Sequence, residues 1–149
     1  MDCTETGSLA EENTLVNWPE FEAQRAQLGA HFARILGYFQ EDGIKSVELI
    51  EAAVRDRDSA ALVRPAHTLK GEAAQFGATV LSELAEKIEL SARHFVEAQV
   101  TPEEIVPDAA KLRPLFNKTL EQLLRETNPL VQRRRFGVKE SSNQSFGRL

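Results

Sequence analysis

The sequence has few of the residues that disulfide-bonded, thiolate-metal or membrane-spanning proteins need. Its single cysteine, Cys3, excludes a disulfide framework and a thiolate metal cage in a chain of 149 residues, and this fits a reducing compartment. No apolar run approaches the roughly 18 residues of a transmembrane helix. The first residues, MDCTETGSLAEEN, are acidic where a signal peptide would be basic and then apolar. We therefore expect a soluble, cytoplasmic protein without a membrane partner.

Most of the chain also lacks a net positive charge. Residues 128–149 carry a net charge of +4 and the preceding residues −9, which together give the formal −5. A surface that follows nucleic-acid phosphates needs its lysines and arginines on the folded part, so we expect no nucleic-acid partner. The chain has no Gly-rich phosphate loop and no Walker-type sequence. It is therefore not expected to take phosphate from ATP by itself.

Helical periodicity is what the sequence does contain. Apolar residues recur at three- and four-residue spacing, while strand-like alternation and hairpin dipeptides are missing. Asp42-Gly43 is expected to loosen or kink one helix, and Pro114 to kink the last helix or to lie near its true start. Several amphipathic segments with short connections predict an all-α fold. The predicted architecture is an antiparallel up-and-down four-helix bundle with a short additional N-terminal helix.

Three regions follow from this pattern. Residues 1–17 lack periodicity and are expected to form a flexible N-terminal arm. Residues 18–127 hold the helical pattern and are expected to form the bundle domain, beginning at a helix that Asn17 can cap. Residues 128–149 are basic and are expected to form a disordered tail.

The segment AHTLKGEAAQFGA, Ala66–Ala78, carries the candidate chemistry. At about 100° per residue, Lys70 and Gly71 lie within roughly 60° of His67, and the buried stripe of this helix lies on the far side. A neutral imidazole nitrogen is a good nucleophile, and the ammonium of Lys70 can neutralise the charge of a phosphoryl group beside it. Gly71 weakens the helix but removes a side chain that would block a phosphoryl donor.

Plainer interpretations apply to the other histidines and to metal binding. A lone exposed histidine is usually an ordinary surface residue, and His31 and His94 have no neighbours like those of His67. Metal sites in helical bundles need inward Glu-x-x-His pairs on facing helices, and the sequence has none. We expect no metal ion and no cofactor to be bound by this chain.

The run HTLKG, followed by a small and polar stretch that ends in FGA, resembles the phosphorylation-site motif of histidine phosphotransfer (HPt) domains. These domains are four-helix-bundle intermediates of multistep phosphorelays. The resemblance implies that His67 accepts a phosphoryl group on Nε2 from a receiver-domain aspartate and passes it to another receiver. It assigns charge neutralisation to Lys70 and clearance to Gly71. The family also has a Gln or Glu on the next helix that accepts the other imidazole N–H, and Glu89 matches it by register.

The same resemblance implies a phosphorelay component that acts as a stoichiometric carrier without ATP-binding or autokinase activity. Its partners would be receiver domains of response regulators and, as a further candidate, the receiver domain of a hybrid histidine kinase. The receiver would supply Mg²⁺ and most of the catalytic groups. We expect a monomer that docks receivers through residues around His67, namely Val63, Arg64, Ala74 and Gln75.

Two residues depart from an ordinary helix or from the family pattern. Glu72 stands where many members have a small residue, but it projects about 140° from His67 and should be tolerated. Pro65 removes a helix hydrogen bond and is a candidate for a bend before the site.

One alternative function is a non-catalytic helical adaptor that binds or sequesters a receiver domain. Another is a partner-binding protein unrelated to signalling, in which Gly71 only eases helix packing.

Overall fold

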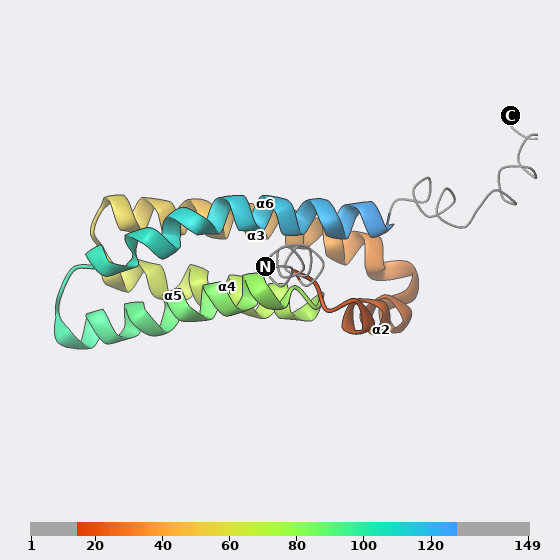
Figure 1. Cartoon of the computed structure of the whole chain (residues 1–149), viewed down its shortest axis with the longest axis horizontal. Coiled ribbons are helices and arrows are strands. Elements are labelled where there is room, and N and C mark those ends of the chain that lie inside the picture. Colours follow the sequence, from red (N-terminus) through yellow and green to blue (C-terminus); the bar gives the residue numbers. More distant parts are fainter. Residues whose placement is uncertain (1–14, 128–149) are drawn as a thin grey trace, which may run out of the picture. The chain divides into compact units, whose positions relative to one another are not determined.

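The computed structural model describes residues 15–127, which form helices and turns without a strand, as the all-α prediction requires. The helices are α2 (Trp18–Leu28), α3 (Phe32–Arg55), α4 (Ser59–Gln75), α5 (Thr79–Ala98) and α6 (Val106–Thr127) (Figure 1). Two short 3₁₀ turns, Gly29–His31 and Glu103–Ile105, precede α3 and α6. Residues 1–14 and 128–149, which hold most of the predicted arm and the whole predicted tail, lie outside the described residues.

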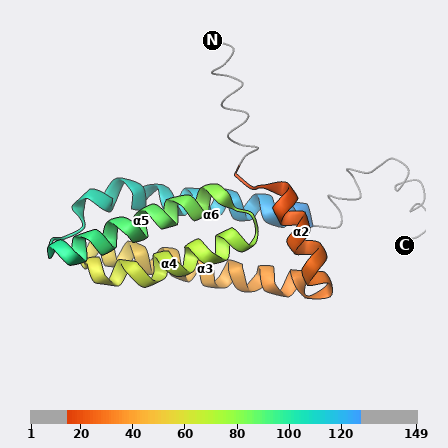
Figure 2. The same ribbon diagram turned by 90° about the horizontal axis from the view of Figure 1, so that it is seen from below.

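The chain divides into two units, Met1–Thr119 and Leu120–Leu149, and the division falls within α6. In the first unit, α3, α4 and α5 lie side by side, while α2 runs at an angle to α3 (Figures 1 and 2). The turn before α4 is short because Asp58 caps the helix, its side chain accepting a hydrogen bond of 3.1 Å from the backbone N–H of Ala61. All of the predicted site residues belong to this first unit.

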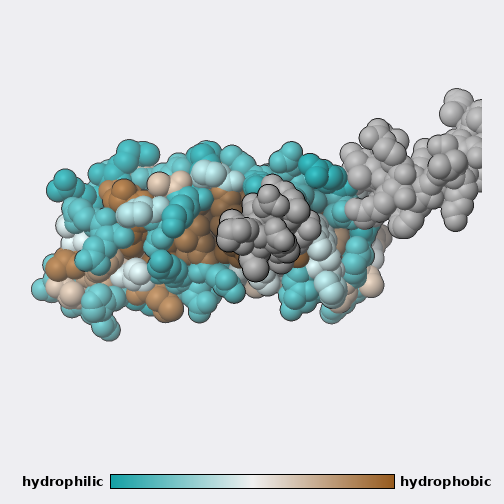
Figure 3. Space-filling view, viewed as in Figure 1, coloured by the Kyte–Doolittle hydropathy of each residue, from teal (hydrophilic) through white to brown (hydrophobic). Residues whose placement is uncertain are grey.

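The core of the first unit is built from one apolar face of each helix. Apolar side chains gather between the helices and are framed by hydrophilic ones on the face shown in Figure 3. Each large side chain withdrawn from water contributes about 1.5–3 kcal/mol. No helix within residues 15–127 is both long and apolar enough to cross a membrane. The fully buried valine, leucine and isoleucine residues of α3 to α6 in this unit are Val47, Ile50, Leu62, Leu69, Leu81, Ile88 and Leu112.

A continuous row of aromatic rings connects the elements of this core. The ring centroids of successive neighbours are 5.4–5.7 Å apart, within the range of favourable edge-to-face and tilted pairs. The row joins α2, α3, the turn after α4, and α6. In order of contact its members are Phe21, Phe32, Phe76, Phe39 and Phe116.

The FGA segment after α4 holds the N-terminal part of the described chain in place. Gly77 has φ +74°, and a Cβ there would stand 2.7 Å from the carbonyl oxygen of Asn17. The backbone N–H of Asn17 in turn donates a 2.7 Å hydrogen bond to the carbonyl of Gly77. Leu15 and Val16 are buried beside this contact. The packed chain therefore includes residues 15–17, which the sequence pattern places in a flexible arm.

The helix bounds bear on two expectations about helix breaks, and they rule out a helix that starts near Pro114. Helix α3 continues unbroken through Asp42 and Gly43. A Cβ on Gly43 would stand 2.4 Å from Cε1 of Phe116, so this glycine permits a close approach of α6. Helix α6 begins at Val106, earlier than expected, and contains Pro114. Pro114 cannot donate to the carbonyl of Ala110, and Ala110 is exposed, so water can satisfy that carbonyl.

Candidate functional site

The apolar stripe of α4 determines which side chains face solvent. Leu62, Ala66 and Leu69 are fully buried, and this leaves His67 on the outer face with its side chain 60% exposed. Gly71 lies one turn further along the same face. A Cβ on Gly71 would meet nothing within 4 Å. The site therefore consists of an exposed imidazole beside an unobstructed stretch of backbone.

Glu89 approaches His67 from the neighbouring helix α5. It follows Ala85 by one turn, at the edge of the stripe that Ala85, Ile88 and Ala92 bury against α4. Its side chain is only 4% exposed. Glu89 Oε2 lies 3.0 Å from Nδ1 of His67. The register that the family resemblance implied does bring these two residues into hydrogen-bond contact.

Two cations also contact the Glu89 carboxylate. Lys70 Nζ lies 3.0 Å from Oε1, an ion pair without hydrogen-bond geometry. Arg93, one turn beyond Glu89 on α5, donates two hydrogen bonds to Oε2, from Nε at 3.0 Å and from a terminal nitrogen at 2.7 Å. Sequence reasoning missed Arg93, although its position four residues after Glu89 is the usual spacing of a helical ion pair. His67, Lys70, Glu89 and Arg93 thus form one charged cluster.

This cluster determines the ionisation of Glu89 and the hydrogen-bonding state of His67. Burial alone would raise the pKa of Glu89, but the hydrogen bonds from Arg93 and His67 and the close positive charge of Lys70 outweigh it and lower the pKa to about 2. An ionised carboxylate can only accept hydrogen bonds, so Nδ1 of His67 must be the donor. In the neutral ring, Nε2 then carries the lone pair. Within residues 15–127 no hydrogen bond to Nε2 is formed.

A hydrogen bond between the helices fixes the backbone beside the site. The hydroxyl of Ser82 on α5 donates to the carbonyl of Lys70 on α4 at 3.0 Å. This bond helps to keep α4 and α5 in the register that places Glu89 under His67. Pro65 lies within the continuous helix α4 and is buried two residues before His67.

Glu72 lies apart from the charged cluster. It is half-buried, and its buried Oε1 has no hydrogen-bond partner in the described part of the chain. Burial and the nearby charge of Asp42 raise the pKa of Glu72. The helical geometry predicts this orientation of Glu72 away from His67. The side chain is nevertheless more buried than a position on an exposed flank of the helix would be.

The four predicted docking residues lie on α4 before and after His67, and two of them line separate hollows. Val63 is half-buried and lines a shallow hollow with Arg93 and Val96. Ala74 lines a different hollow, with residues of α5 that include Ser82. Arg64 and Gln75 are exposed on α4 and line neither hollow. The predicted set therefore divides between the two sides of His67.

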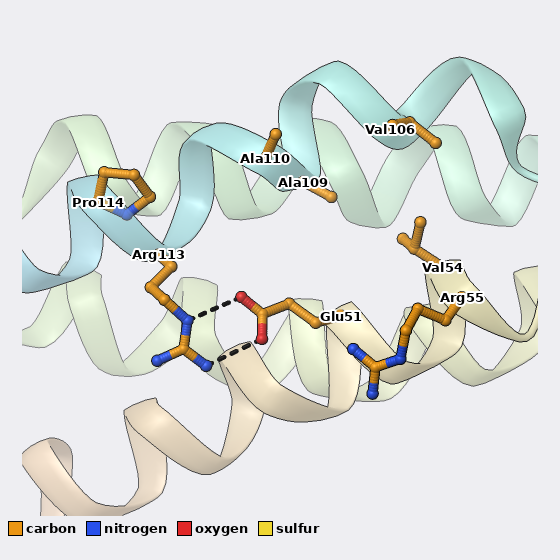
Figure 4. Close-up of a pocket in the computed structure, with 8 residues that line it drawn as sticks. All are labelled: Glu51, Val54, Arg55, Val106, Ala109, Ala110, Arg113 and Pro114. Atoms are coloured by element: carbon orange, nitrogen blue, oxygen red, sulfur yellow. Dashed lines mark hydrogen bonds and ion pairs between the residues drawn. The ribbon is translucent and has the colours of Figure 1, made fainter.

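A larger groove, of about 490 Å³, lies between α3 and the first part of α6. Arg113 spans it by donating to both carboxylate oxygens of Glu51 at 2.8 and 2.9 Å (Figure 4). None of the residues that line this groove belongs to the predicted site. Within residues 15–127, no group of three or more His, Cys, Asp and Glu side chains is placed to hold a metal ion.

Comparison with known proteins identifies the family. The family model of the Hpt domain matches residues 34–127, which is more than half of the chain and includes His67 and all of its contacts. No curated protein and no solved structure gave a match. Histidine phosphotransfer is a function of phosphorelay signalling, and an exposed imidazole held by a buried carboxylate is suited to it. On the strength of the family match, this chain belongs to the Hpt domain family.

Proposed function

We propose that the protein carries phosphoryl groups between receiver domains, with His67 as the acceptor. The observation that carries this proposal is the His67–Glu89 contact of 3.0 Å from an ionised, buried carboxylate to Nδ1. It fixes the proton on Nδ1 and leaves Nε2 with its lone pair on an exposed ring. Nε2 is the proposed phosphorylation atom.

The proposed step is an in-line displacement at the phosphorus of a receiver's aspartyl phosphate. Nε2 forms a bond to phosphorus while the bond between phosphorus and the aspartate oxygen breaks. The aspartate leaves as a carboxylate, and the imidazole becomes positively charged with its proton still on Nδ1. That positive charge lies against Glu89, which stabilises it. Transfer to a second receiver is the same step in reverse.

Lys70 and Gly71 complete the proposed site. Lys70 lies one turn from His67 and offers an ammonium to the phosphoryl oxygens. Gly71 leaves open the space through which the receiver's aspartate approaches. We propose that the receiver contributes Mg²⁺ and most of the catalytic groups, and that Val63, Arg64, Ala74 and Gln75 contact it. On this proposal the chain is a stoichiometric carrier that binds no cofactor and does not use ATP.

The finer architecture is part of the same proposal. We propose an antiparallel up-and-down bundle of α3, α4, α5 and α6, with α2 as the short additional helix and a domain that begins near Leu15. Support comes from the short connections between successive helices. A monomer is proposed because the face around His67 must remain free to receive a partner, and the cytoplasm because of the scarcity of cysteine.

The experiment is incubation of the protein with separately phosphorylated, radiolabelled receiver domains. The wild-type protein should acquire label that is labile in acid and stable in alkali, the behaviour of phosphohistidine. His67→Gln should acquire none. His94→Gln is the matched control, because His94 is exposed on α5 and makes no contact with the charged cluster.

Two results would contradict phosphotransfer. One is a wild-type protein that takes no label from any receiver, and the other is a His67→Gln protein that takes as much as wild type. A receiver that binds tightly without transferring its label would favour the adaptor alternative.

A further inference from the structure

The Glu89 carboxylate has two cationic partners, and they use different oxygens. Arg93 donates twice to Oε2, the same oxygen that accepts Nδ1–H of His67. Lys70 contacts only Oε1. One positive charge is enough to neutralise a carboxylate. One of these two cations can therefore bind another anion while the other keeps the negative charge of Glu89 neutralised.

The contact geometry indicates which cation can leave. Arg93 is held by two bonds of 2.7 and 3.0 Å, and a guanidinium loses little conformational freedom for each bond it makes. Lys70 is held by one contact of 3.0 Å that lacks hydrogen-bond geometry. It lies on α4, on the same face as His67, whereas Arg93 lies one turn beyond Glu89 on α5. Lys70 is therefore held by fewer bonds than Arg93 and is the partner that can leave at the lower cost.

Departure of Lys70 would be unfavourable without Arg93. The Glu89 side chain is 4% exposed, and an unpaired charge at that depth would be poorly solvated. It would also lie close to the incoming negative charge of a phosphoryl group. With Arg93 in place, Glu89 stays neutralised and keeps its hydrogen bond to Nδ1 throughout.

We propose that Arg93 is a positioning residue that keeps Glu89 paired and bound to His67 while the ammonium of Lys70 moves from Glu89 to the phosphoryl group on Nε2. The inference rests on the proposed function, because it assigns a step to the phosphorylated state. No new bond to phosphorus is involved beyond the transfer already described. The exchange replaces one ion pair, between Lys70 and Glu89, by another, between Lys70 and the phosphoryl oxygens.

The first test uses the unphosphorylated protein and needs no receiver. Lys70→Gln imitates the departure of the ammonium, and ¹⁵N and ¹H NMR of His67 report whether Nδ1 still carries a hydrogen-bonded proton. We expect the Nδ1–H signature to persist in Lys70→Gln and to be lost when Arg93→Gln is added. Loss of the signature in Lys70→Gln alone would overturn the proposal, and so would its persistence in the double variant.

The second test measures transfer rates from a phosphorylated receiver. Arg93→Gln should slow transfer roughly tenfold, and Arg93→Lys should restore part of the rate because it restores the charge. In a Glu89→Gln background, Arg93→Gln should have no further effect. An equal effect in both backgrounds would show that Arg93 acts on docking instead, and would overturn the proposal.

Controls separate this inference from the proposed function. Lys87→Gln removes one positive charge from the same helix as Arg93, but Lys87 pairs with Asp108 and not with Glu89. The Lys87→Gln protein should therefore accept phosphoryl groups at the wild-type rate. Circular dichroism confirms that each variant is folded. A wild-type protein that takes no label would overturn the proposed function and the exchange step together. The NMR result by itself decides whether Arg93 holds Glu89 on His67.

Discussion

Acid titration of Glu89 tests the charged cluster directly. The perturbation is Glu89→Gln, which keeps the shape of the side chain and removes its charge. The quantity of interest is the difference in free energy of unfolding between wild type and this variant, followed from about pH 7 to about pH 2. The other carboxyl groups titrate in both proteins, so their contributions largely cancel in the difference.

The magnitude follows from the lowered pKa. Contacts in the folded state reduce the pKa of Glu89 from its ordinary value of 4.5 to about 2. A carboxyl with a lowered folded-state pKa stabilises the fold above its unfolded pKa, and this contribution is lost as the pH falls through the folded value. At about 1.36 kcal/mol for each pH unit between the two values, the loss is about 3 kcal/mol. Because the side chain is 4% exposed, solvent screening reduces this figure little.

The assay is urea unfolding at a series of pH values, with the midpoint and slope fitted at each. Wild type should lose about 3 kcal/mol relative to Glu89→Gln between about pH 5 and pH 2. Any offset from the substitution itself stays constant and does not affect the comparison. Glu86→Gln, at an exposed position on the same helix, should show no such loss. A difference between wild type and Glu89→Gln that is independent of pH would refute the reasoning.

Two further predictions concern glycines. Gly43→Ala should lower the free energy of unfolding by about 1–3 kcal/mol, because its Cβ would stand 2.4 Å from Phe116. Gly37→Ala lies in the same helix, and its Cβ would meet nothing within 4 Å. This second substitution should be neutral or should raise the free energy of unfolding by up to about 1 kcal/mol. Thermal unfolding compares the two, and equal effects would contradict the close approach. Gly71→Leu should fold at least as stably as wild type yet accept phosphoryl groups from a receiver roughly tenfold more slowly or worse. Transfer at the wild-type rate would exclude the clearance role.

Much of the fold could be predicted because helical periodicity is a local property. The apolar stripes and the capping residues Asn17 and Asp58 each depend on residues within one or two turns. The effect of Gly43 could not be predicted in the same way. Whether a glycine kinks a helix or admits a neighbour depends on what packs against it, and here that is Phe116, far along the chain. Leu15 and Val16 illustrate the same limit, since their burial depends on the distant Gly77 turn.

For the site, too, residues on one helix could be predicted, and contacts between helices could not. His67, Lys70 and Gly71 share one helix, so their common face follows from the angle per residue. Glu89 could be proposed only from the family's register, and Arg93 was not proposed at all. The spacing of Glu89 and Arg93 predicts an exposed ion pair of little consequence. Only the packing of α5 against α4 buries the carboxylate, and burial makes both of its cations matter.

The surroundings of the glycines bear on the alternative in which Gly71 merely eases helix packing. At Gly43 and Gly77 a Cβ would collide with the protein's own atoms, at 2.4 and 2.7 Å, so internal packing explains those two residues. A Cβ at Gly71 would meet nothing within 4 Å, so internal packing does not explain this glycine. Open space alone is not specific, since Gly37 has it too. Gly71 differs because it lies one helical turn from the exposed ring of His67 and on the same face, which supports the proposal that its open space admits the molecule that reaches Nε2.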